Sequence, residues 1–133
     1  MLQDDVCKNQ KVNQLVNLFT CAFVDGSFDE SEKKFLLEIA KRLKVEQISI
    51  DNLYELQKNI SDNFSITQNL DEEEKIQHII DLVFMMMIDC QICEKQLEFC
   101  KNVAKQTGYE SKIVDLLISR ILKEIKVEVH TEN

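Results

Sequence analysis

The sequence predicts an all-α protein: a single compact helical domain of about six helices, built from two related three-helix halves. The chain has 133 residues, a length that suits one domain and is short for two. It contains no proline and only two glycines, Gly26 and Gly108, so it lacks the turn residues that sandwiches, barrels and βαβ folds require. Its apolar residues recur every three or four positions, as on one face of a helix.

Three apolar stripes in the first half of the chain predict three helices. They cover residues 12–23, 35–43 and, more weakly, 50–60. An Asp-Gly turn at 25–27 separates the first two. Residues 61–70 have no period and many side chains that bond their own backbone, which predicts a loop.

Three further stripes in the second half predict three more helices. They cover residues 76–88, 97–104 and 113–125, and we expect the tail after Lys126 to be frayed. Gly108 is expected to end the fifth helix as its C′ residue. His78 falls off the apolar stripe of its helix, whereas Phe84 falls on it.

The two halves are also related to each other by an internal repeat. When the chain is shifted by 64 residues without a gap, residues 12–60 align with 76–124, and nine of the 49 pairs are identical. Apolar pairs such as Val12/Ile76 and Val16/Ile80 keep the two patterns in phase. Each half therefore consists of a helix, a short acidic turn and two more helices. The alternative is that any two helical segments share such spacing.

The charge and the cysteine content limit the classes of partner and the cellular compartment that we expect. The net charge of −8 disfavours nucleic acid and anionic lipid as partners, because both are negatively charged. Five cysteines, an odd number within apolar helical patterns, do not form a disulfide framework and suit a reducing compartment. The N-terminus has no signal-peptide pattern, and polar residues interrupt the most apolar stretch, 76–92. We therefore expect a cytoplasmic protein without membrane insertion.

The acidic turn of each half carries a family resemblance. In the first half, Ala22-Phe-Val-Asp-Gly-Ser-Phe-Asp-Glu-Ser-Glu32 precedes Phe35-Leu-Leu-Glu-Ile-Ala40, and the second half repeats this as Met87-Ile-Asp-Cys-Gln-Ile-Cys-Glu94. The pattern resembles the TerB-like family, whose domains occur in tellurite-resistance proteins and in a membrane-anchored J-domain cochaperone. The resemblance covers nearly the whole chain, 1–133, as one domain. Two departures are Cys90 in place of Gly26 and Gln96 in place of Glu32, and we expect neither a J-domain nor a membrane anchor.

The resemblance implies a duplicated helical fold, a link to stress-response assemblies, and metal binding by the acidic turns. The residues concerned are Asp25, Asp29, Glu32, Asp89 and Glu94, whose oxygens suit a divalent cation such as Ca²⁺ or Mg²⁺. The spacing is not that of an EF-hand. Local physics offers another interpretation, because Asp29 and Glu32 fit a capping box, as do Asp71 and Glu74.

Other reactive side chains point to less specific chemistry. Cys90 and Cys93 form a Cys-x-x-Cys pair, which a zinc or redox site would use, but no second pair completes a zinc site. The run Met85–Met87 is typical of gap-filling core residues, although methionines also suit surfaces that bind partner helices. Neither His78 nor His130 has neighbours that form a catalytic triad.

The sequence thus favours a non-enzymatic protein with no cofactor that can be named with certainty. The first hypothesis is a protein-interaction or adaptor module that binds a protein partner, with self-association left open. The second is a divalent-cation-binding or sensing domain that uses the Asp-Gly turn. The third is a zinc or redox site at Cys90 and Cys93.

Overall fold

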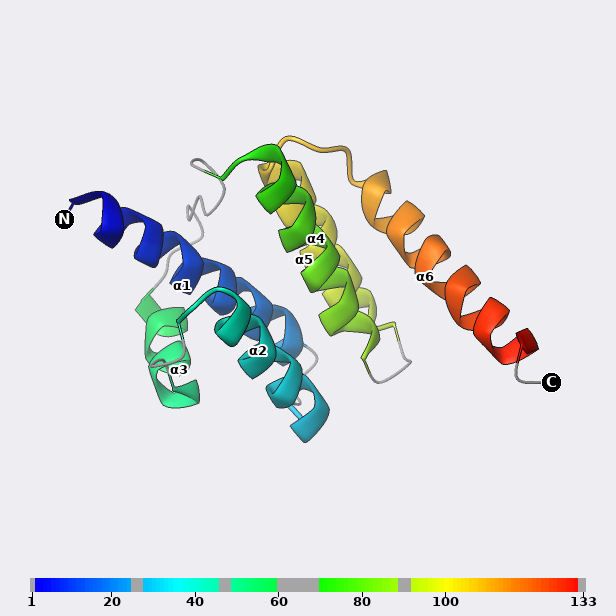
Figure 1. Cartoon of the computed structure of the whole chain (residues 1–133), viewed down its shortest axis with the longest axis horizontal. Coiled ribbons are helices and arrows are strands. Elements are labelled where there is room, and N and C mark those ends of the chain that lie inside the picture. Colours follow the sequence, from blue (N-terminus) through cyan, green and yellow to red (C-terminus); the bar gives the residue numbers. More distant parts are fainter. Residues whose placement is uncertain (1, 25–27, 46–48, 60–69, 89–91, 132–133) are drawn as a thin grey trace.

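Six α-helices make up the described part of the chain, and no strand occurs there. The computed structural model describes residues 2–24, 28–45, 49–59, 70–88 and 92–131, with side chains described for 11–24, 28–45, 49–55, 70–88 and 92–124. The helices are α1 (Leu2–Phe23), α2 (Glu30–Arg42), α3 (Ile50–Asn59), α4 (Glu72–Met87), α5 (Glu94–Gln106) and α6 (Lys112–Thr131) (Figure 1). The predicted all-α class and six helices are confirmed.

The central pair of helices is α1 and α4, which pack against each other. α1 also contacts α2, α3 and α5, while α4 also contacts α2, α5 and α6, and α5 packs on α6. In Figure 1, α1–α3 lie to one side of α4 and α5, and α6 lies on the other side. These contacts bring apolar side chains of neighbouring helices together, so each helix contributes buried residues to the core.

A single hydrophobic core joins all six helices. Its members come from α1 and α4 in the centre and from the inner faces of the outer helices: Leu15, Leu18, Phe19, Leu36, Leu53, Ile79, Leu82, Met85, Met86, Cys100 and Val114. Burial of each large side chain stabilises the fold by roughly 1.5–3 kcal/mol. Met85 and Met86 are both buried, which confirms them as core residues.

Helix α3 is held against α1 by an aromatic cluster. The Tyr54 ring lies edge-on to Phe19 and Phe23, with ring centroids 4.8 and 5.1 Å apart. Phe28, just before α2, packs edge-on against Phe19 at 5.2 Å. Such pairs add about 0.5–1.5 kcal/mol beyond the area they bury. The cluster therefore fixes the weakest of the predicted helices by tertiary packing.

The starts of α2 and α4 are capped as the sequence predicts. Asp29 Oδ1 accepts the Glu32 N–H at 2.9 Å, while the Asp29 N–H donates to Glu32 Oε1 at 3.0 Å. Asp71 and Glu74 form the same reciprocal pair, at 2.8 and 3.3 Å. Both are capping boxes, which satisfy amide groups that the first turn of a helix leaves free.

The ends of α2 and α5 share one geometry. Gly108 has a φ of +95° and Lys44 a φ of +63°, both in the left-handed region. In α5, the Tyr109 N–H donates to the Ala104 carbonyl and the Gly108 N–H to the Lys105 carbonyl; Val45 and Lys44 make the matching bonds in α2. These are Schellman motifs. Gly108 is thus confirmed as a C′ residue, and Lys44 holds the same position without being glycine.

Three sequence predictions need correction. His78 is buried, at 2% exposure, because α4 is covered by α1, α2, α5 and α6 and so has a buried face wider than one apolar stripe. Phe84, by contrast, is 43% exposed. The last helix continues to Thr131 instead of fraying after Lys126. The predicted loop at 61–70 lies outside the described residues, except for Leu70, which is buried.

Candidate functional site

The acidic turns are described only in part. Asp29 caps α2, Glu32 lies in the first turn of α2, and Glu94 is the exposed first residue of α5. Asp25 and Asp89 lie outside the described residues. Within the part of the chain that the structure describes, no group of three His, Cys, Asp or Glu side chains is arranged to hold a metal ion. The described acids of the first turn, Asp29 and Glu32, are engaged with backbone amides of the cap.

Glu32 of α2 and Gln96 of α5 are both buried, at 3% and 2% exposure. Gln96 Nε2 donates to the Cys21 carbonyl at 2.9 Å, so this side chain joins the start of α5 to the end of α1. A buried carboxylate or amide without such partners would be costly. Gln96 therefore joins two helices, whereas the Glu32 carboxylate accepts the backbone N–H of Asp29 within the cap of its own helix.

The Cys-x-x-Cys pair is represented by Cys93 alone, since Cys90 lies outside the described residues. Cys93 is the N-cap residue of α5, is half-buried, and makes no side-chain capping bond. Only one ligand of the predicted zinc or redox site is thus described.

A buried polar contact, which the sequence pattern missed, lies between the central helices. Asn17 Nδ2 on α1 and His78 Nε2 on α4 are 3.0 Å apart. With the amide as donor, Nε2 accepts and the neutral ring carries its proton on Nδ1. That Nδ1 has no hydrogen-bond partner among the described residues. Burial, together with the charge of Arg42, lowers the pKa of His78 to about 4, so the ring is neutral at pH 7.

An ion pair beside His78 joins α2 to α4. The Arg42 guanidinium meets both oxygens of the buried Asp81 carboxylate, and Arg42 Nη1 lies 3.2 Å from Oδ1. Gln77 Nε2 donates to the same Oδ1 at 3.0 Å. Asp81 is thereby fully engaged, which offsets the cost of burying its charge. In the sequence, this ion pair could have been suspected from Asp81, an acidic residue within the most apolar helix.

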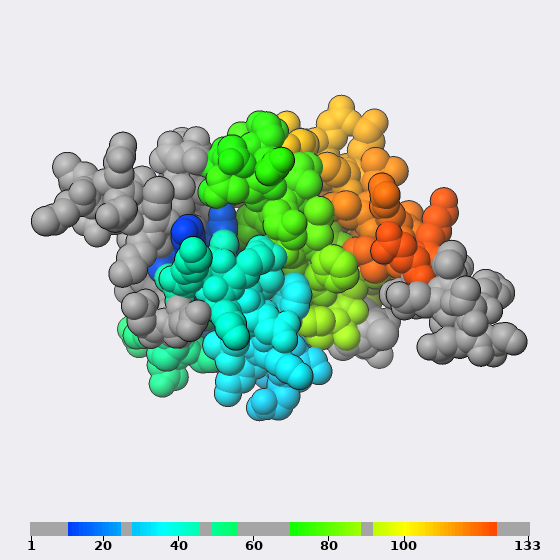
Figure 2. Space-filling model, viewed as in Figure 1, coloured from blue at the N-terminus to red at the C-terminus, as the bar shows by residue number. Residues whose placement is uncertain are grey.

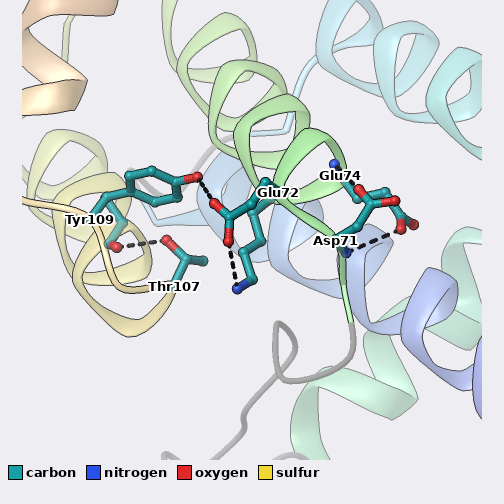
Figure 3. A network of polar contacts seen from close by, with 7 residues as sticks. Asp71, Glu72, Glu74, Thr107 and Tyr109 are labelled. Atoms are coloured by element: carbon teal, nitrogen blue, oxygen red, sulfur yellow. Dashed lines mark hydrogen bonds and ion pairs between the residues drawn. The ribbon is translucent and has the colours of Figure 1, made fainter.

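Tyr109 ties the connection between α5 and α6 to the start of α4 (Figure 3). Its hydroxyl donates to Glu72 Oε2 at 2.6 Å, and Lys75 Nζ lies 3.4 Å from Glu72 Oε1. The Tyr109 hydrogen bond, with help from Lys75, lowers the pKa of Glu72, and the bond to Glu72 raises the pKa of Tyr109. The contact is exposed to solvent, so it is weak.

The outward face of α4 is apolar, and it is only partly covered. Ile76, Ile80 and Met87 are half-buried and Phe84 is exposed, and these four side chains follow one another at helical spacing along one side of α4. Figure 2 shows α4 in green at the surface between α2 in cyan and α6 in orange. We call these four residues the outward α4 face. It is an apolar surface of the kind that marks interaction sites.

No helix in the described part of the chain is both long and apolar enough to cross a membrane. Comparison with protein families, with characterised proteins and with solved structures finds no match to this chain. The outward α4 face is therefore identified as the candidate site from the structure of this chain alone.

Proposed function

We propose that the protein is a non-enzymatic interaction module, an adaptor, whose outward α4 face docks a protein partner. One observation carries this proposal: the most apolar helix of the chain is not fully covered, and an exposed Phe84 continues the line of Ile80 and Ile76. Water contact with these side chains is unfavourable, so covering them contributes to binding. Aromatic residues in such patches often contribute most of the binding energy.

The spacing of the outward α4 face supports an amphipathic helix as the partner. Apolar side chains at 76, 80, 84 and 87 form a straight ridge with the spacing of successive helical turns. An amphipathic helix that presents its own apolar stripe packs against such a ridge over about three turns. The net charge of −8 disfavours nucleic acid and anionic lipid as alternatives.

We further propose that the domain is a duplicated, TerB-like fold. Three observations support the duplication. Helices α2 and α5 have 13 residues each, and both their first and last residues differ by 64 positions. The two Schellman motifs, at Lys44 and Gly108, are separated by the same 64 positions. The buried polar residues Glu32 and Gln96 also correspond. The TerB-like assignment rests on the resemblance of the acidic turn, and with it comes the proposed link to stress-response assemblies.

Site-specific photo-crosslinking in cells tests the adaptor proposal. A photoreactive phenylalanine analogue is placed at Phe84, and in a matched variant at Leu116, an exposed α6 residue outside the outward α4 face. The proposal predicts a discrete crosslinked species from position 84 that position 116 does not give. Equal crosslinking from both positions, or none from position 84, contradicts it. A crosslinked species of twice the chain mass would identify a second copy as the partner.

A further inference from the structure

Two buried thiols from opposite halves of the chain lie in contact. Cys21 on α1 and Cys100 on α5 have Sγ atoms 3.8 Å apart, although 79 positions separate them in the sequence. Both side chains are completely buried. Each Sγ also lies close to the Leu82 carbonyl of α4, at 3.8 and 3.7 Å. Three helices of the central core therefore converge on this pair.

We propose that Cys21 and Cys100 are a modification site: a reversible disulfide that cross-links α1 to α5 under oxidising conditions. The sulfurs are already in van der Waals contact, and forming the bond shortens their separation to about 2 Å. Side-chain rotation and small helix shifts supply that movement, at the expense of the contacts with the Leu82 carbonyl. The site is separate from the Cys90 and Cys93 pair and does not depend on the adaptor function.

The oxidant is a small disulfide such as glutathione disulfide. The thiolate of one cysteine attacks a glutathione sulfur, which forms a mixed disulfide and releases one glutathione thiolate. The thiolate of the second cysteine then attacks the protein sulfur of that mixed disulfide and releases the second glutathione. In total, two thiols lose two electrons and two protons, and one glutathione disulfide becomes two glutathione molecules. Excess glutathione reverses both steps.

Burial controls how fast this reaction proceeds. Because neither sulfur reaches solvent, the oxidant can react only when α1 and α5 open locally. Cys93, at the start of α5, is half-buried and provides an internal reference for an accessible thiol. We therefore expect Cys21 and Cys100 to stay reduced during brief exposure to the oxidant and to form their disulfide during sustained exposure. Once closed, the bond restricts the unfolded chain across a long loop and so stabilises the fold.

The test uses the full chain with Cys7→Ser, Cys90→Ser and Cys93→Ser, which leaves only the proposed pair. It is incubated in native buffer with oxidised and reduced glutathione, and its intact mass and melting temperature are measured. We expect an intramolecular product about 2 Da lighter than the reduced chain. We also expect its melting temperature to be higher by at least about 5 °C. Low concentrations of urea should accelerate its formation, because opening is required. The matched variant with Cys21→Ser in addition should give no such product.

Peptide mapping of the oxidised wild-type chain provides a second measurement that does not depend on the variant with three serine substitutions. A Cys21–Cys100 linkage supports the proposal. Linkage of Cys90 to Cys93 without the core pair, cross-linking only between chains, or a cross-linked product that melts at a lower temperature would overturn it.

Discussion

At the scale of single residues, the two positive-φ positions show how the same geometry is met by different side chains. Lys44 and Gly108 both complete Schellman motifs, but only glycine adopts this backbone without steric strain. A Cβ built on Gly108 meets no atom within 4 Å, so strain and not crowding decides the effect of a substitution there.

We therefore expect opposite effects from two substitutions. Lys44→Gly should raise the free energy of unfolding by about 0.5–1 kcal/mol, and Gly108→Ala should lower it by about 1 kcal/mol. Urea denaturation measures both. If the two substitutions changed stability in the same direction, the matched helix ends described above would be wrong.

His78 gives the protein a pH dependence with a defined sign. Its pKa in the folded protein is about 4, below the ordinary value of 6.5, so the unfolded chain binds more protons in this range. The stabilisation is fully present above pH 6.5 and is lost as the pH falls toward 4. The loss amounts to about 3 kcal/mol once both states are protonated.

The variant His78→Gln isolates this contribution, because glutamine keeps a polar group and does not titrate. Its stability should fall less than that of the wild type between pH 7 and pH 5, as measured by urea denaturation at each pH. Parallel profiles for the two proteins would show that His78 does not titrate as described.

Asp29 and Glu32 form the capping box of α2, and the metal site that the acidic turn predicts is a separate hypothesis. Asp29→Ala should lower the free energy of unfolding by about 1 kcal/mol, and Asp71→Ala, at the equivalent cap of α4, should do the same. Millimolar Ca²⁺ or Mg²⁺ should leave the melting temperature of the wild type unchanged. If the protein bound the ion, a free ion concentration of a hundred times the Kd would raise the free energy of unfolding by about 2.7 kcal/mol. A rise abolished by Asp25→Asn would favour the divalent-cation function over the adaptor.

At the scale of helices, the spacing of apolar residues predicts where each helix lies in the sequence better than it predicts which side chains are buried. All six apolar stripes coincide with helices, and Gly108 marks the end of the fifth. The stripe fails on α4, where His78 and Asp81 are buried and Phe84 is exposed. The reason is that α4 has four neighbouring helices, and which side they leave open depends on tertiary packing, which a single-helix pattern does not contain.

The candidate site was predictable only in part for the same reason. The capping boxes depend on residues three positions apart, and the sequence predicted both. The contacts of Asn17 with His78, of Arg42 with Asp81 and of Cys21 with Cys100 join residues 39 to 79 positions apart. No local pattern brings such residues together, so only the fold reveals them.

The buried Asp81 predicts how α2 is attached to α4. Asp81→Ala removes the acceptor of both Arg42 and Gln77 and leaves Arg42 without its carboxylate. We expect a loss of about 1.5–3 kcal/mol, because two charge-assisted hydrogen bonds and the Gln77 bond are lost, while the half-exposed Arg42 guanidinium stays in contact with water. Lys101 and Asp115 form a more exposed pair, and Asp115→Ala, the matched control, should cost less than about 1 kcal/mol. Equal losses, measured by urea denaturation, would contradict this difference.

At the scale of the whole molecule, α1 and α4 form the axis around which the two halves pack. Each contacts helices of both halves, so the core is continuous from α2 and α3 to α5 and α6. This arrangement covers α1 and α4 on their inner sides and leaves the outward α4 face at the surface (Figure 2). The adaptor function that we propose rests on this partly uncovered apolar face of the most apolar helix.

The most direct test of the adaptor proposal is the affinity for the partner identified by crosslinking at position 84. Phe84→Ala should weaken binding by at least about tenfold, whereas the matched variant Leu116→Ala should change the Kd by less than about twofold. Both side chains are exposed, so both variants should remain folded, which circular dichroism checks. If Phe84→Ala bound the partner as tightly as the wild type does, the outward α4 face would not be the docking surface.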